Sequence, residues 1–117
     1  MLLSAFVFSL GMSLPVLAGA APGPAEACLE VFPGGVARPE EPMRRAQTWT
    51  LWAQQADHPV GFYRQAAKLY ECAIEKSKAL QKEDSENVGK YAALQRQAET
   101  ALQQAQVRVE NNWDTFR

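Results

Sequence analysis

Residues 60–82, VGFYRQAAKLYECAIEKSKALQK, place apolar side chains at intervals of three and four positions. This spacing keeps the apolar side chains on one side of an α-helix, so the stretch predicts a helix of about this extent. One stripe on it contains Phe62, Ala66, Leu69, Ala73 and Leu80, and a second stripe beside it contains Tyr63, Ala67, Tyr70 and Ile74. An apolar face this broad predicts contact with two neighbouring helices.

The segments on either side predict those two neighbours. Residues 41–56 carry apolar side chains at helical spacing, and Asp57-His58-Pro59 ends this helix because the residue before a proline disfavours helical backbone. Residues 86–111 repeat small and apolar side chains along one face, opposite a face rich in Gln, Glu and Arg. No run of alternating β-branched residues predicts a strand. The sequence therefore predicts an all-α fold, a small three-helix antiparallel bundle in a domain of residues 43–117.

Residues 63–75 resemble the second helix of a tetratricopeptide repeat. The small–aromatic–small spacing of that family is matched by Ala66, Tyr70 and Ala73. The similarity covers about residues 43–82, and it implies two antiparallel helices that cross closely around an aromatic side chain. The three-helix layout is also similar to that of the microtubule-interacting-and-transport domain. Both resemblances imply a helical module that binds proteins.

The first twenty residues carry no charged side chain and end in Ala18-Gly19-Ala20. An apolar run followed by small residues, at the positions that a signal peptidase reads, predicts a signal peptide over residues 1–20 with cleavage before Ala21. The alternatives are a retained membrane anchor and a buried core helix. The apolar run of about sixteen residues is shorter than the roughly 20 residues that a membrane-spanning helix needs.

Proline and glycine are concentrated in residues 21–42, which predicts an irregular arm or linker before the bundle. The arm contains one apolar island, Cys28-Leu29-Glu30-Val31-Phe32. We expect this island to be a short strand-like piece that docks on the helices, because leaving its apolar side chains exposed would be costly. A segment that binds a partner is the alternative.

Cys28 and Cys72 are the two cysteines of the chain, and the sequence leaves three states open for them. In an exported protein two cysteines often pair, and a Cys28–Cys72 disulfide would fasten the arm to the second helix of the bundle. Two separate thiols, with Cys72 buried on a helix face, are the second state. In the third, Cys28 is the lipidated first residue of a bacterial lipoprotein, which would anchor the protein to a membrane.

The composition offers little sign of reaction chemistry. Its 12 basic and 13 acidic side chains give a net charge of −1, so no nucleic-acid-binding surface is expected. His58 is the single histidine, and no cluster of His, Cys and carboxylate residues has the spacing of a metal site. We therefore expect no metal, no cofactor and no enzymatic activity.

These features together predict an exported protein of the periplasm or the extracellular space. We expect it to act as a protein-interaction or structural subunit of an envelope assembly, with Trp49, Trp52, Trp113 and Phe116 as its partner surface. A lipoprotein anchored through Cys28 and a self-associating helical bundle are the alternatives. Contact with a membrane is expected only if Cys28 is lipidated or the apolar N-terminal segment is retained.

Overall fold

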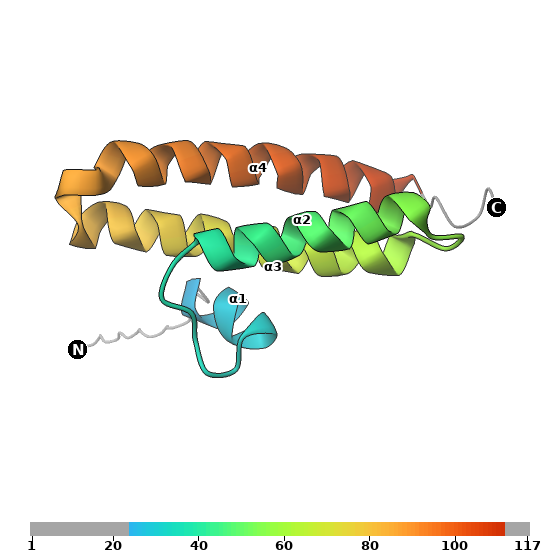
Figure 1. Ribbon diagram of the computed structural model, residues 1–117, viewed down its shortest axis with the longest axis horizontal. Helices are drawn as coiled ribbons and strands as arrows, with labels where there is room; N and C mark the ends of the chain where they lie inside the picture. Colours follow the sequence, from blue (N-terminus) through green and yellow to red (C-terminus); the bar gives the residue numbers. More distant parts are fainter. Residues whose placement is uncertain (1–23, 112–117) are drawn as a thin grey trace, which may run out of the picture.

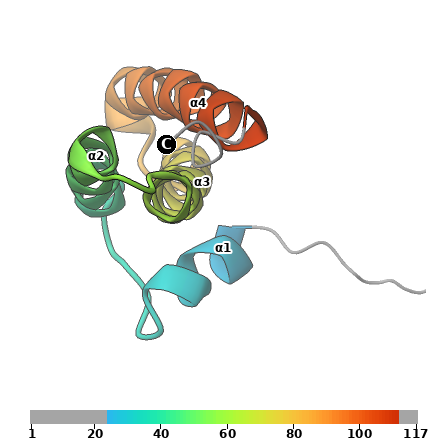
Figure 2. The same cartoon turned by 90° about the vertical axis from the view of Figure 1, so that its right-hand side faces the viewer.

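Helix α3 (Val60–Glu83) is the central helix of the structure, and the other helices pack around it. The computed structural model describes residues 24–111. Before α3 come α1 (Pro24–Val31) and α2 (Glu40–Gln55); after it, the short 3-10 turn η3 (Ser85–Asn87) leads into α4 (Val88–Glu110). Helices α2 and α4 run along α3 (Figure 1), and the end-on view places α1, α2 and α4 on different sides of it (Figure 2). Residues 24–111 contain no strand, so the all-α prediction is confirmed.

The broad apolar face of α3 packs against three neighbouring helices, α1, α2 and α4, whereas the sequence predicted two. One core cluster combines side chains of α2, α3 and α4, namely Met43, Ala46, Ala66, Leu69, Tyr70, Ala73, Ile74 and Ala98. Val31 and Phe32, at the end of α1, pack against the same cluster. A smaller cluster, Ala53, Tyr63 and Ala105, lies toward the other end of the bundle. Each neighbour therefore covers part of the apolar surface of α3.

Each of the three long helices places a fully buried alanine in the core. These are Ala46, Ala66 and Ala98. A methyl side chain lets two helix backbones approach closely, and Tyr70 fills space that the alanines leave. The small–aromatic–small spacing of α3 is therefore explained by packing.

The apolar island at residues 28–32 is helical rather than strand-like, so this prediction was wrong. Its residues 28–31 form the second half of α1, and the Phe32 backbone N–H, just after the helix, donates to the Cys28 carbonyl at 2.7 Å. Pro24 is tolerated in the first turn because that position needs no N–H donor. Helix α1 ends at Val31, shortly before Pro33. In the turn that follows, Gly35 adopts a positive φ of 85°. Part of the segment predicted to be an irregular arm is thus a fourth helix, and it packs on α3 as the docking prediction required.

Cys28 and Cys72 form a disulfide that joins α1 to α3. Their Cα atoms lie 4.5 Å apart, and Cys72 is completely buried. The structure thus adopts the disulfide, one of the three states that the sequence left open. A sulfur atom in this bond cannot also form the thioether of a lipoprotein, so lipidation of Cys28 and the described fold exclude each other.

The boundaries of the three long helices agree with the sequence to within about two residues. Pro39 and Pro59 directly precede α2 and α3, where a missing N–H costs no helical hydrogen bond. The largest difference is at α4, which starts at Val88 because residues 85–87 form a 3-10 turn. Among residues 24–111, no helix is both long and apolar enough to cross a membrane. The predicted signal peptide, residues 1–20, lies outside the described residues.

A charged cluster links the first turn of α2 to the first turn of α4. Glu40 Oε2 lies 3.3 Å from Arg38 Nη2 and 3.2 Å from Lys90 Nζ. Burial alone would raise the pKa of the Glu40 carboxyl. Its own backbone N–H, Lys90 and Arg38 donate to the ionised form, however, and hold this pKa below the ordinary value of 4.5.

Glu40→Gln is expected to lower the free energy of unfolding by about 0.5–1 kcal/mol near neutral pH, a small effect because the cluster is partly exposed to solvent. The pKa of Glu40 is lower in the folded than in the unfolded chain, so its stabilisation is present above pH 4.5 and is lost as the pH falls below it. Urea unfolding at a series of pH values should show the two proteins converging in acid. Glu41→Gln is the matched control, since the ion pair of Glu41 with Arg45 is exposed.

Candidate functional site

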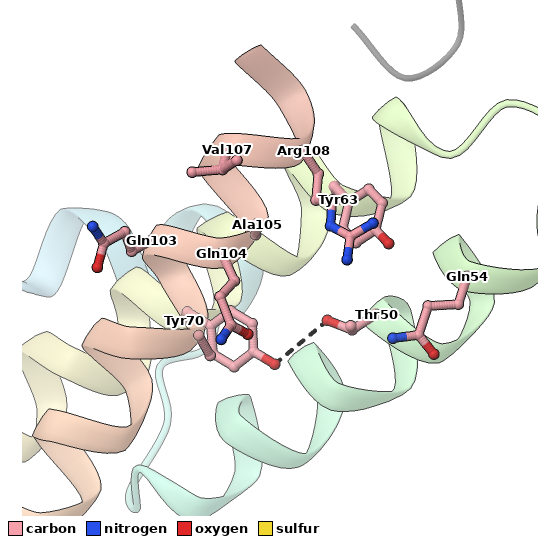
Figure 3. A pocket seen from close by; sticks show the side chains of 10 residues that line it. Thr50, Gln54, Tyr63, Tyr70, Gln103, Gln104, Ala105, Val107 and Arg108 are labelled. Atoms are coloured by element: carbon pink, nitrogen blue, oxygen red, sulfur yellow. Dashed lines mark hydrogen bonds between the residues drawn. The ribbon is translucent and has the colours of Figure 1, made fainter. Parts of the chain in front are cut away.

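A groove opens between α2 and α4, because both helices pack on α3 but barely contact each other. It has a volume of about 430 Å³ and lies over the first half of α3. Its walls and floor are formed by Thr50, Gln54, Tyr63, Tyr70, Ala101, Gln103, Gln104, Ala105, Val107 and Arg108. Thr50 and Gln54 face Gln104 and Arg108 across the groove, with two tyrosine rings between them (Figure 3). We call this site the α2–α4 groove.

Two hydroxyl groups meet in the groove, that of Thr50 on α2 and that of Tyr70 on α3. The Thr50 hydroxyl donates to the Ala46 carbonyl at 2.9 Å, so its proton is already committed. The 3.4 Å contact between Thr50 Oγ1 and the Tyr70 hydroxyl is therefore best satisfied with Tyr70 as the donor. This long hydrogen bond connects the floor of the groove to one of its walls.

The opposite wall carries the positive charge of the groove. The Arg108 guanidinium lies 5.8 Å from the centre of the Tyr63 ring, within the range of a cation–π contact. Tyr63 itself is buried and belongs to the smaller core cluster. The groove therefore presents mainly amide groups and one guanidinium, above two tyrosine rings that are only 5% and 4% exposed.

A second surface feature is the aromatic patch, which we define as Trp49, Trp52 and Phe62. The Trp49 and Trp52 rings meet edge to face with centroids 5.0 Å apart, and Trp49 lies 5.6 Å from Phe62. The patch projects from a different side of α2 than Thr50, because consecutive helical residues lie about 100° apart. Trp52 is 49% exposed, although its ring packs on a partly buried neighbour.

Arg45 connects the surface beside the aromatic patch to the end of α1. Arg45 is four residues before Trp49 and therefore on the same side of α2, and its guanidinium lies 5.0 Å from the centre of the Phe32 ring. The disulfide of α1 thus fixes one border of the surface that carries the patch.

A second, more open groove of about 500 Å³ lies between α1, α3 and the end of α4. Charged side chains dominate it, with Glu30 paired to Lys68 at 3.0 Å. Burial raises the pKa of the Glu71 carboxyl above its ordinary value, and the nearby Glu30 and Glu75 raise it further. Lys68 acts in the opposite direction on this pKa, and Arg64 also lines the groove, so the charge of this groove is mixed.

The structure brings together two of the four aromatic residues that the sequence predicted as a partner surface. Trp49 and Trp52 lie in the aromatic patch, whereas Trp113 and Phe116 lie outside the described residues. The sequence placed Phe62 on a core stripe and did not predict its contact with Trp49. His58 is exposed in the turn between α2 and α3. Within residues 24–111, no group of three or more His, Cys, Asp or Glu residues could hold a metal ion.

The chain matches no protein-family model, no curated protein and no solved structure. The resemblances to the tetratricopeptide repeat and to the microtubule-interacting-and-transport domain therefore stay predictions.

Proposed function

We propose that this protein is an exported helical interaction or structural subunit of an envelope assembly, without catalytic activity of its own. It contacts a protein partner through the aromatic patch. The observation that carries this proposal is the half-exposed Trp52, whose ring packs on Trp49, which in turn contacts Phe62.

Trp52 has the properties of an interface anchor. Tryptophan buries a large apolar area at little cost in conformational entropy, and binding hot spots are enriched in it. The edge-to-face contact with Trp49 restrains the ring before a partner arrives, so less ordering is needed on binding. An apolar side chain on the partner would complete the burial of the Trp52 ring.

Two observations support an exported location. Disulfides persist in oxidising compartments, and Cys28 and Cys72 form one between buried positions. The uncharged, apolar residues 1–20 have the composition of an export signal. An envelope partner follows from this location.

A photoreactive amino acid introduced at Gln55, which is exposed and lies one helical turn after Trp52 on α2, is expected to crosslink one discrete envelope protein in cells while Trp52 stays in place. With that partner purified, Trp52→Ala should weaken binding by about 30-fold or more, which is the scale of a hot-spot residue. Surface-bound full-length protein and a titration of the partner give the dissociation constants.

Leu51 provides the matched control, because it is 57% exposed and adjacent in sequence but lies outside the patch. Leu51→Ala should bind the partner as the unchanged protein does. Equal weakening by both substitutions would contradict the proposed surface. Crosslinks that form only between two copies of the chain would replace the proposal with self-association.

A further inference from the structure

The disulfide and the aromatic patch lie at the two ends of a short series of neighbouring residues. Phe32 follows Cys28 by one helical turn, and its backbone N–H donates to the Cys28 carbonyl at 2.7 Å. The centre of the Phe32 ring lies 5.0 Å from the Arg45 guanidinium. Arg45 lies one turn before Trp49 on α2, and the Trp49 ring meets the Trp52 ring edge to face. A movement of α1 therefore reaches the patch through few side chains.

Phe32 and Trp49 are also connected through the core. Both side chains are partly buried, and both pack against the core cluster that joins α2, α3 and α4. Protein interiors are packed without spare volume, so withdrawing the Phe32 ring removes contacts from this cluster. The arrangement of Trp49, and of the Trp52 ring that packs on it, therefore depends on whether α1 is docked.

Helix α1 depends on the disulfide for its position. It has 8 residues, fewer than an isolated helix needs for stability in water. It packs on α3 and barely contacts α2 and α4 (Figure 2). Besides the disulfide, its attachments are the packing of Val31 and Phe32 and the half-exposed ion pair of Glu30 with Lys68. We therefore expect α1 to leave α3 when the disulfide is absent.

We propose that the Cys28–Cys72 disulfide controls the aromatic patch, so that the chain binds its partner tightly only after oxidation in the compartment to which it is exported. In the dithiol state α1 separates from α3, Phe32 separates from Arg45, and the two tryptophan rings of the patch lose their restrained arrangement. The partner and the exported location rest on the proposed function. The link between disulfide and patch rests on contacts within this chain alone.

The reaction that docks α1 is thiol–disulfide exchange with an external disulfide, of the kind that a dithiol oxidoreductase carries. The thiolate of one cysteine attacks the external disulfide, which releases one external thiol and leaves a mixed disulfide. The second cysteine then attacks the sulfur of the first and releases the other external thiol. One S–S bond forms and one breaks, two protons pass to the external thiols, and the external disulfide accepts two electrons. Cys28 and Cys72 are buried once joined, which protects their bond from further exchange.

The test compares the oxidised full-length protein with the same protein fully reduced by dithiothreitol, using nuclear magnetic resonance of isotope-labelled chains. Reduction is expected to shift the side-chain N–H signals of Arg45, Trp49 and Trp52. The side-chain amides of Gln81 and Gln95, which hydrogen-bond at 2.7 Å between α3 and α4, should keep their signals. If α1 signals change while those of the patch do not, the proposal is wrong. If the glutamine signals move as well, the whole bundle has rearranged, and the proposal is likewise overturned.

Two substitutions beside Cys28 give a matched comparison. Phe32→Ala keeps the disulfide but removes the ring, so the Arg45 and Trp49 signals of its oxidised form should lie close to those of the reduced unchanged protein. Leu29→Ala is the control, because Leu29 lies in α1 but is 50% exposed, and its response to dithiothreitol should match that of the unchanged protein. Equal responses of the two variants would contradict the route through Phe32.

A binding measurement separates this proposal from the proposed function. With the crosslinked partner purified, reduction should weaken its binding by about 5-fold or more, the lower end of typical coupling between two sites. Binding that depends on Trp52 but is equal in the oxidised and reduced proteins would overturn the redox control and leave the partner surface in place. Signals that shift on reduction, together with binding that Trp52→Ala does not weaken, would overturn the partner surface and support the link between disulfide and patch.

Discussion

Reduction of the Cys28–Cys72 disulfide is expected to lower the free energy of unfolding by about 4 kcal/mol, on the chain-entropy relation for a loop of this size. The bond joins cysteines 44 positions apart, and breaking it restores conformational freedom to the unfolded chain. Domains of this kind are stable by only about 5–15 kcal/mol, so this is a large share of the total. Urea unfolding with and without a reductant measures the difference.

The Cys28→Ala/Cys72→Ala variant is the control for this experiment, because its unfolding midpoint should not respond to the reductant. Mass spectrometry must show that both thiols of the unchanged protein are reduced. If the midpoint of that reduced protein equals the midpoint of the oxidised protein, the disulfide contributes nothing to stability and the expectation is wrong.

The loss should be concentrated in α1. Apart from the disulfide, α1 is held by the packing of Val31 and Phe32 and by the Glu30–Lys68 ion pair. Both side chains of that pair are about half exposed, so it contributes at most about 1 kcal/mol. Hydrogen exchange of the α1 amides should therefore accelerate more on reduction than exchange in α3.

The long helices could be predicted because their apolar spacing is continuous, but α1 could not. Pro24 and the Pro33-Gly34-Gly35 turn lie so close together that composition suggested an irregular arm. Between them the chain has room for only 8 helical residues, fewer than an isolated helix needs for stability in water. The helix depends on tertiary contacts, above all the disulfide to Cys72, and local sequence patterns do not report such contacts.

The candidate site was predictable only where its residues share one helix. Trp49 and Trp52 are three residues apart, so their proximity follows from helical geometry. The contact of Trp49 with Phe62 depends on how α2 folds back on α3. The Arg108–Tyr63 contact likewise requires knowing which side of α3 receives α4. The spacing of residues within one helix does not show how two helices pack against each other, so neither contact could be predicted.

Leu69→Ala is expected to lower the free energy of unfolding by about 2–5 kcal/mol, because it removes buried methyl groups and leaves a cavity. Leu69 is 2% exposed and lies in the core cluster that joins α2, α3 and α4. Its neighbours there include Ala46 and Ala73, whose short side chains cannot move into the vacated space. Urea unfolding of the oxidised proteins measures the loss while the disulfide stays intact.

Leu51→Ala applies the same chemical change on the neighbouring helix, where Leu51 is 57% exposed. Its effect should stay within about 0.5 kcal/mol, the range of ordinary surface substitutions. Both leucines lie inside helices, so helix propensity affects the two variants equally and the difference between them reports burial. If the two substitutions cost the same free energy, Leu69 would not occupy a packed core, and α3 would not be the helix around which the others assemble.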